Sequence, residues 1–244
     1  MTDLETEPGR LTAVGVGPGD PELLTLKAVR AIETADVILA PKATSEGGSV
    51  AAGIIRDLLD PARQELREQL YPMKKDAAEL AAFWSDAARE VAELLDDGRD
   101  VVFTTIGDPY LYSTFTYLRR HLGQIRPEVR VEVLSGLSSV QAAAAAADIP
   151  LGIADERIAI VPATFEGDEL ERTLEAFDTV VLMKVSRVFE RVRTLLRDKG
   201  LLKGAVYCRQ VGLPQERIWF DLDEVGEEDL HYLSLVIVRK NFEV

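Results

Sequence analysis

The chain has 244 residues, of which 47% are hydrophobic, and a formal net charge of −14. This composition excludes a largely disordered protein, and the length allows one large domain or two smaller ones. The negative charge argues against nucleic acid as a main partner, since phosphate binding needs a positive face. No apolar run approaches the ~18 residues of a membrane span, so we expect no membrane association.

Cysteine and histidine are too sparse for a disulfide framework or a metal site. The single cysteine, Cys208, fits a reducing cytoplasm, and its apolar neighbours predict a buried strand residue rather than a nucleophile. The two histidines, His121 and His231, are isolated, so we expect no metal. The acidic N-terminus lacks the basic and apolar regions of a signal peptide, and we therefore expect a cytoplasmic protein.

Apolar strand-like runs alternate with helical patterns along nearly the whole chain. The strands are predicted at residues 11–16, 36–40, 66–71, 100–105, 130–134, 157–161, 178–184, 204–209, 216–221 and 232–239. The helices are predicted at residues 21–34, 49–59, 76–97, 110–122, 138–147, 168–176 and 187–198. This alternation predicts an α/β fold with mostly parallel sheets and helices on their faces.

The clearest helix is predicted at residues 76–97, where apolar side chains recur at i, i+3 and i+4 spacing. Trp84 lies on this apolar stripe, and we interpret it as a core residue. Gly98 follows the last turn and provides a natural C-terminal stop.

The number of strands predicts two domains. Ten strands are many for one open sheet, and residues 123–129 offer a plausible break. We therefore predict α/β domains at residues 1–127 and 128–244. The short connection between the last two strands predicts antiparallel pairs at the end of the second domain.

The tripeptide Gly-Asp-Pro occurs twice, at residues 19–21 and 107–109, each time just after a predicted strand. In both copies the aspartate can cap a following helix, while proline suits the first helical position. Glycine-rich turns let the backbone approach a ligand closely. Because ligands of α/β folds bind beyond the carboxyl ends of strands, we expect the two loops to meet over one cleft.

Neither common nucleotide-binding fingerprint is present. Gly15 and Gly17 begin a dinucleotide pattern, but Asp20 stands where the third glycine belongs. A P-loop is absent, because no Gly-Lys-Ser/Thr sequence occurs. By spacing alone, a structural turn and a ligand loop are equally good interpretations of the first Gly-Asp-Pro segment.

Several segments taken together resemble one known family. They are residues 15–28 (GVGPGDPELLTLKA) with 35–37, 105–115 (TIGDPYLYSTF), 133–139 (VLSGLSS) with 149–151, 181–185 (VLMKV), 207–210 (YCRQ) and 232–235 (YLSL). This set resembles the tetrapyrrole (uroporphyrin/corrin) methylases and spans residues 11–239.

Three local features are similar to one branch of that family, which methylates C-20 of precorrin-2 or cobalt-factor II in cobalamin synthesis. They are Tyr71-Pro-Met73 with Trp84 downstream, residues 112–115 and residues 182–185. The uroporphyrinogen III branch carries an aspartate, assigned as a base, at the end of the second strand. Here that strand ends in residues 39–42 (LAPK), so no base is carried over.

The resemblance implies S-adenosylmethionine as cofactor, bound in a cleft between the two domains, and a homodimer. The implied cofactor contacts are Pro18, Ile106, Gly107, Asp108, Leu111, Tyr112, Ser138, Ser139, Met183, Val211, Ser234 and Leu235. It also implies a tetrapyrrole substrate, whose carboxylates need cations and whose flat ring suits apolar or aromatic contacts. The candidate substrate contacts are Lys42, Tyr71, Met73, Lys184 and Arg187.

Two other functions remain open at this point. One is a tetrapyrrole methylase of the same pathway that acts at a different ring position. The other is a nucleotide-binding protein that keeps the fold without catalysis.

Overall fold

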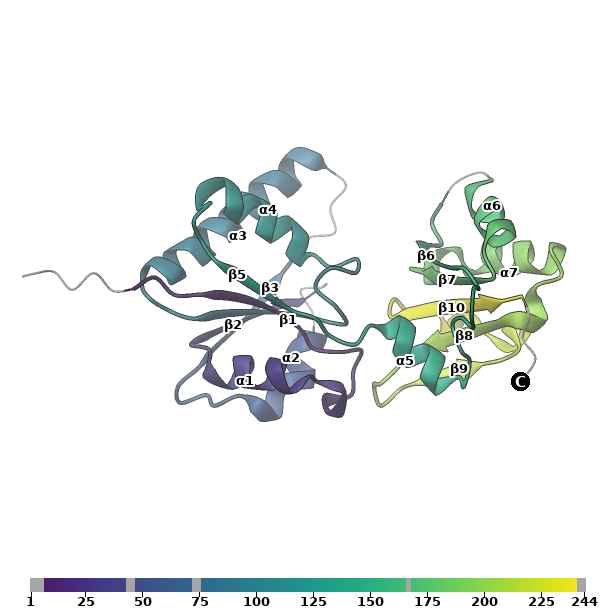
Figure 1. Cartoon of the computed structure of the whole chain (residues 1–244), viewed down its shortest axis with the longest axis horizontal. Helices are drawn as coiled ribbons and strands as arrows, with labels where there is room; N and C mark the ends of the chain where they lie inside the picture. Colours follow the sequence, from purple (N-terminus) through teal and green to yellow (C-terminus); the bar gives the residue numbers. More distant parts are fainter. Residues whose placement is uncertain (1–6, 43–46, 72–75, 166–167, 241–244) are drawn as a thin grey trace, which may run out of the picture. The chain divides into compact units, whose positions relative to one another are not determined.

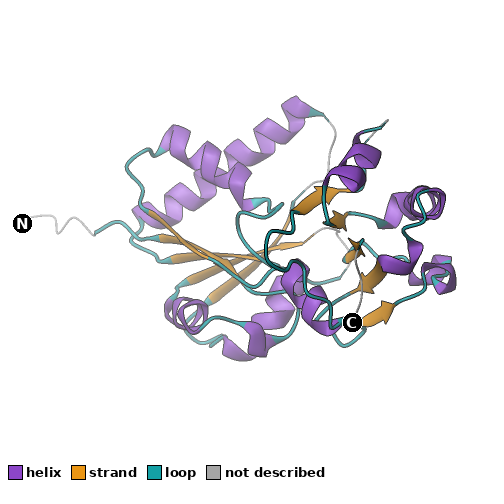
Figure 2. Cartoon of the chain, turned by 45° about the vertical axis from the view of Figure 1, so that its right-hand side comes forward, coloured by secondary structure: helices purple, strands orange, loops and turns teal. Residues whose placement is uncertain are grey.

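Two five-stranded sheets with helices packed on them organise the residues that the structure describes (Figures 1 and 2). The structure is a computed structural model and describes residues 7–42, 47–71, 76–165 and 168–240. The chain divides into two units, Met1–Ser138 and Ser139–Val244, each with one of the sheets. The predicted α/β class with two sheets is confirmed.

The sheet of the first unit is entirely parallel, with the order β3-β2-β4-β1-β5. Its strands are β1 (Leu11–Gly15), β2 (Val37–Lys42), β3 (Glu65–Leu70), β4 (Val101–Thr105) and β5 (Val131–Leu134). The helices of this unit are α1 (Leu26–Thr34), α2 (Val50–Ile55), α3 (Ala77–Asp96) and α4 (Phe115–Ile125). Strand β4 is buried along its whole length, as expected for a parallel strand covered on both faces.

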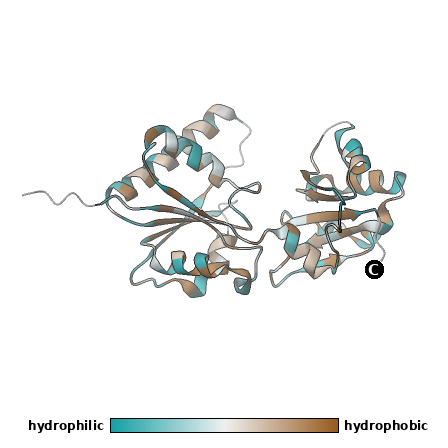
Figure 3. Ribbon diagram, in the orientation of Figure 1, coloured by the Kyte–Doolittle hydropathy of each residue, from teal (hydrophilic) through white to brown (hydrophobic). Residues whose placement is uncertain are grey.

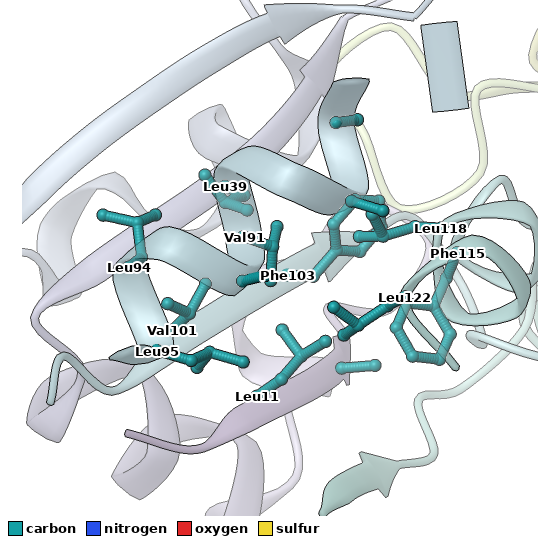
Figure 4. Packing of buried hydrophobic residues seen from close by; sticks show 14 of the residues in the cluster. Leu11, Leu39, Val91, Leu94, Leu95, Val101, Phe103, Phe115, Leu118 and Leu122 are labelled. Carbon is teal, nitrogen blue, oxygen red and sulfur yellow. The ribbon is translucent and has the colours of Figure 1, made fainter. Parts of the chain in front are cut away.

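Helices cover both faces of this first sheet (Figure 1). On one face, Ile32 of α1 belongs to a buried cluster with Val102 of β4. On the other face, α3 and α4 contribute Val91 and Leu118 to a cluster that includes Phe103 of β4 (Figure 4). Burying each such side chain contributes roughly 1.5–3 kcal/mol, so these apolar stripes hold the helices on the sheet.

Local sequence signals delimit α3 as predicted. The side chain of Asp76 accepts hydrogen bonds from two backbone N–H groups of the first turn. Gly98, with φ of 76°, follows the helix in the left-handed conformation that favours glycine. Trp84 is 2% exposed within the core cluster, which confirms its interpretation as a core residue.

The sheet of the second unit is mixed, with the order β6-β7-β10-β8-β9. Strands β6 and β7 are parallel, whereas the other three pairs are antiparallel, as predicted for the end of the chain. The last two strands, however, do not pair with each other, because β8 lies between β9 and β10. The strands are β6 (Ile158–Pro162), β7 (Thr179–Met183), β8 (Ala205–Arg209), β9 (Arg217–Trp219) and β10 (Ser234–Arg239). The helices are α5 (Ser139–Ala146), α6 (Glu169–Ala176) and α7 (Phe189–Asp198).

Hydrophobic residues concentrate along the strands of each sheet (Figure 3). In the second unit, Phe189 of α7 packs edge-on against Tyr207 of β8, with ring centroids 5.1 Å apart. Tyr207 in turn lies 5.4 Å from the ring of Trp219 on β9. These three aromatic rings belong to the core cluster that joins the sheet to α6 and α7.

The division between the units falls later than the predicted boundary after residue 127. Strand β5 pairs with β1 over Leu11–Val14, so it belongs to the first sheet. Residues 123–129, which the sequence suggested as a break, include the end of α4 and the turn into β5. Parallel strands require a crossover connection, and α4 provides it from β4 to β5 within one sheet, across β1.

Candidate functional site

Three loops meet at one edge of the first sheet. They follow β1, β4 and β5, which are adjacent and parallel, so their carboxyl ends lie side by side. The loops comprise residues 16–20, 106–114 and 135–138, and they contain all the cofactor contacts predicted for this unit. Ligands of open α/β sheets bind beyond this edge. The strand order therefore brings together three segments that lie far apart in the sequence.

Glycines allow the backbones of the three loops to touch. A Cβ atom on Gly15 would lie 2.4 Å from the carbonyl oxygen of Gly107 and 2.5 Å from the nitrogen of Gly136. A Cβ on Gly136 would lie 2.2 Å from the same Gly107 oxygen. Gly17 and Gly107 form an isolated antiparallel bridge, in which the Gly107 N–H donates to the Gly17 carbonyl at 2.8 Å. We call Gly15, Gly107 and Gly136 the glycine junction.

Asp108 ties the second loop to the third. Its Oδ1 accepts a hydrogen bond from the Tyr110 N–H at 2.8 Å, and its Oδ2 accepts one from the Gly136 N–H at 3.3 Å. The side chain of Asp20, the aspartate of the other Gly-Asp-Pro tripeptide, accepts a hydrogen bond from the local Glu22 N–H at 2.8 Å. The two copies therefore differ: the first caps a 3₁₀ turn, and the second joins two loops.

The second loop continues beyond residue 110 before a helix begins, which corrects the predicted helix at 110–122. Tyr112 has a φ of 55°, and α4 starts only at Phe115. The Ser113 hydroxyl donates to Thr105 Oγ1 at 3.0 Å and accepts from the Phe115 N–H at 3.2 Å. These side-chain bonds compete with helix formation, which explains the late start of the helix.

Proposed cofactor contacts of the second unit gather at one edge of its sheet. Strand β10 lies between β7 and β8, and Leu235 is opposite Met183 in the register. Ser234, the first residue of β10, is opposite Arg209, the last residue of β8. Val211 lies in the turn that follows β8. Antiparallel pairing thus places the start of β10 beside the carboxyl ends of its two neighbours.

This edge combines buried side chains with unusual backbone conformations. Val211, Ser234 and Leu235 are buried, so packing fixes the positions of their side chains. Lys184 and Gln210, the residues directly after β7 and β8, have φ values of 57° and 49°. Non-glycine residues with such φ angles are strained, and they cluster at binding sites more than elsewhere.

Comparison with known proteins identifies the family. Residues 10–226 match the Tetrapyrrole (Corrin/Porphyrin) Methylases.

The chain belongs to the tetrapyrrole methylase family.

Individual members of the family align along almost the whole chain. It is 36% identical over 236 residues, 96% of this chain and 98% of the relative, to cobalt-precorrin-2 C(20)-methyltransferase of Salmonella typhimurium. It is 34% identical to precorrin-2 C(20)-methyltransferase of Sinorhizobium sp, over 94% of this chain and 95% of that protein. Among solved structures, uroporphyrin-III C-methyltransferase from Thermus thermophilus, in complex with S-adenosylhomocysteine, matches with a TM-score of 0.63 and 27% identity. That match covers 95% of this chain and 98% of the other.

The candidate substrate residues of this tetrapyrrole methylase lie in different surroundings. Lys42 ends β2 and is half-buried, while Lys184 and Arg187 are exposed near the end of β7. Met73 lies outside the described residues. Tyr71 differs from the expectation of a substrate contact, because its side chain is only 4% exposed.

Packing explains the position of Tyr71. Its ring lies 5.0 Å from that of Trp84 and 5.4 Å from that of Phe83, and its hydroxyl donates to Gln69 Oε1 at 2.9 Å. Burial, with a smaller contribution from the charge of Glu90, raises the pKa of this hydroxyl above its ordinary value. Tyr71 is therefore a core residue that supports the end of β3.

Sequence reasoning missed two parts of the site. Gly136 was not singled out, although a glycine just after a strand was the available signal. The Thr105–Ser113 pair was also missed, because only the fold shows that the chain turns back on itself there.

The described residues hold little else that would suggest different chemistry. Within the described ranges, no group of three or more His, Cys, Asp or Glu side chains could hold a metal ion. Cys208 is buried, and burial raises the pKa of its thiol to about 12, so it carries no thiolate near neutral pH. Across that same part of the chain, every helix is too short or too polar to cross a bilayer.

Proposed function

We propose that this protein is an S-adenosylmethionine-dependent methyltransferase that methylates C-20 of precorrin-2 or cobalt-factor II in cobalamin biosynthesis. The observation that carries the proposal is the similarity to C-20 methyltransferases along nearly the entire chain, at 34–36% identity. The same assignment is supported by local sequence similarity to the C-20 branch of the family at residues 71, 84, 112–115 and 182–185.

The edge of the first sheet fits the methionine part of the cofactor. Bound S-adenosylmethionine supplies an electrophilic methyl group on a sulfonium. Gly17 and Gly107 have positive φ, and an added Cβ there would meet nothing closer than 3.6 Å, so both turns keep their outer side open. The proposed contacts in this part of the chain are Pro18, Ile106, Gly107, Asp108, Leu111, Tyr112 and Ser138, and Ser139 begins the next helix.

The edge of the second sheet fits adenine. Met183, Val211, Ser234 and Leu235 offer apolar surface and backbone groups at three neighbouring strand ends. Such a surface selects a flat heterocycle by shape and by a few directed hydrogen bonds.

The chain's own contribution to the reaction is binding, orientation and the exclusion of water. Holding the acceptor carbon about 3–3.5 Å from the methyl group supplies much of the rate enhancement of such a transfer. Neither a metal nor a covalent nucleophile is needed for this purpose. We propose that Lys42, Lys184 and Arg187 pair with carboxylates of the macrocycle.

We further propose a cytoplasmic homodimer that does not act on nucleic acid. The support is the family resemblance, the single cysteine and the net charge of −14.

The test is to incubate the purified protein with S-adenosylmethionine carrying a ¹³C-labelled methyl group. Metal-free precorrin-2 and cobalt-factor II are supplied in parallel reactions, with protein omitted as control. We expect a product heavier by one methyl group, with the label at C-20 in the carbon NMR spectrum. A label at another ring position would contradict the assignment, and the faster of the two reactions identifies the metal state of the substrate.

A further inference from the structure

A buried carboxylate, Asp229, lies outside all the predicted site residues. It ends the 3₁₀ turn Glu227–Asp229, shortly before β10, and is only 7% exposed. Burying a charge is unfavourable unless the charge is paired and hydrogen-bonded. The partners of this carboxylate therefore indicate what it holds in place.

Two arginines and one backbone amide surround the Asp229 side chain. Arg209 Nη1 and Arg217 Nη1 donate to its Oδ1 at 3.3 and 3.4 Å, and the Gly226 N–H donates to its Oδ2 at 3.3 Å. The Asp229 carbonyl accepts a hydrogen bond from the Tyr207 hydroxyl at 3.1 Å. One residue thus joins β8, β9 and the turn before β10.

Arg209 links the carboxylate to the turn after β8. Its Nε donates to the side-chain oxygen of Gln210 at 3.2 Å, and the Gln210 N–H donates to the Leu233 carbonyl at 2.7 Å. Gln210 has a φ of 49°, a strained value for a non-glycine residue that persists only where the surroundings impose it. The guanidinium of Arg209, which Asp229 holds in place, is part of the surroundings that impose this conformation on Gln210. Val211, one of the proposed cofactor contacts, directly follows Gln210 in the chain.

Tyr207 links the same residue to the start of β10. Its hydroxyl, besides donating to the Asp229 carbonyl, accepts from the His231 N–H at 3.3 Å. The His231 carbonyl in turn accepts from the Ser234 hydroxyl at 2.6 Å. Val211 and Ser234, on two different strand ends, are therefore held through contacts that converge on one residue.

We propose that Asp229 is a positioning residue for the adenosine-binding edge of the second unit. Through Arg209 and Tyr207 it fixes the turn after β8 and the start of β10, without touching the cofactor itself. This inference rests on the proposed function only in taking S-adenosylmethionine as the ligand of that edge.

The test compares Asp229→Asn with a matched variant at the opposite end of β10. Glu156→Gln removes a carboxylate that pairs at 2.9 Å with Arg239, a buried arginine at the opposite end of β10. Both changes replace the carboxylate partner of an arginine by an amide, at the half-buried Arg209 in one variant and at the buried Arg239 in the other, but only Asp229 lies near the proposed edge. Calorimetry gives the Kd of S-adenosylmethionine, thermal unfolding gives stability, and kinetics give KM for each substrate.

We expect Asp229→Asn to raise the Kd and the KM for S-adenosylmethionine by about tenfold, because misplacing a binding group by a fraction of an ångström costs affinity. The KM for the tetrapyrrole stays unchanged. Glu156→Gln lowers the melting temperature similarly but leaves the cofactor Kd as in the wild type. If Asp229→Asn does not fold, Arg209→Met, which keeps the apolar stem and removes the guanidinium, is expected to raise the Kd in the same way.

An unchanged cofactor Kd in a folded Asp229→Asn or Arg209→Met variant would overturn the inference. Equal increases in Kd for Asp229→Asn and Glu156→Gln would also overturn it, since they would indicate general loosening of the fold. The proposed function fails separately, if the wild-type protein binds cofactor but methylates a ring position other than C-20. The Kd comparison remains decisive in that case, because it does not depend on the acceptor.

Discussion

At the scale of single residues, two aspartates in identical tripeptides have different partners. Asp20 accepts a local N–H of its own turn, whereas Asp108 bonds to Tyr110 in its own loop and to Gly136 in another. The sequence predicts a capping role for both. Only the second also holds together two loops that follow adjacent strands.

This difference gives a direct experiment. We expect Asp108→Ala to weaken S-adenosylmethionine binding at least tenfold, because the loops that present the proposed contacts lose their tie, and to reduce the free energy of unfolding by about 1–2 kcal/mol. Asp20→Ala is the matched control, with a similar loss of about 1 kcal/mol and a smaller change in affinity. Calorimetry and urea unfolding measure the two effects. Equal losses of affinity in both variants would indicate that capping alone matters.

At the scale of elements, the site depends on how closely neighbouring loops approach. Gly15 and Gly136 of the glycine junction leave no room for a side chain, since Cβ atoms added to them would lie 2.2–2.5 Å from backbone atoms of the neighbouring loops. The predicted elements agree with the structure except at two helix starts. In the helix predicted at 21–34, Pro21–Leu23 is a separate 3₁₀ turn and α1 begins at Leu26, where Thr25 caps it. The helix predicted at 110–122 is α4, which begins only at Phe115. That helix begins late because the Ser113 hydroxyl bonds to Thr105 and to the Phe115 N–H, which no helical periodicity reveals.

Substitution of a junction glycine tests this close approach. We expect Gly136→Ala to destabilise the protein by about 1–3 kcal/mol or more, because backbone rather than a flexible side chain must move, and to abolish cofactor binding. Gly123→Ala in α4 is the control, since its Cβ would meet nothing within 4 Å and the helix gains about 0.5–1 kcal/mol. Urea unfolding of both variants measures whether each substitution lowers or raises the free energy of unfolding. A neutral Gly136→Ala would contradict the packing argument.

At the scale of the whole molecule, each of the two units has its own sheet and its own core. The proposed cofactor contacts are drawn from both units. A ligand stabilises every folding unit that binds it, and at 100 times its Kd the stabilisation is about 2.7 kcal/mol.

Calorimetric unfolding with and without cofactor tests the contribution of each unit. We expect S-adenosylmethionine at 100 times its Kd to raise the melting temperature by roughly 2–4 °C per kcal/mol of stabilisation. If the units unfold in separate transitions, both should move. A shift of one transition alone would contradict the proposed cofactor contacts of the other unit. NAD at the same concentration serves as the control ligand.

The sequence by itself determined the α/β class, the ten strands, the positions of the glycine-rich loops and the family. These features are encoded locally, in hydrophobic periodicity, in glycine and proline turns, and in motifs that are continuous along the chain. The core position of Trp84 also followed from its place on the apolar stripe of α3.

Only the tertiary structure decided which segments meet. The order β3-β2-β4-β1-β5 brings three distant loops to one sheet edge and assigns β5 to the first unit rather than the second. The same long-range packing buries Tyr71 and gathers two arginines around Asp229. Strand order and side-chain partners depend on contacts between residues remote in sequence, and no local pattern of residues specifies them.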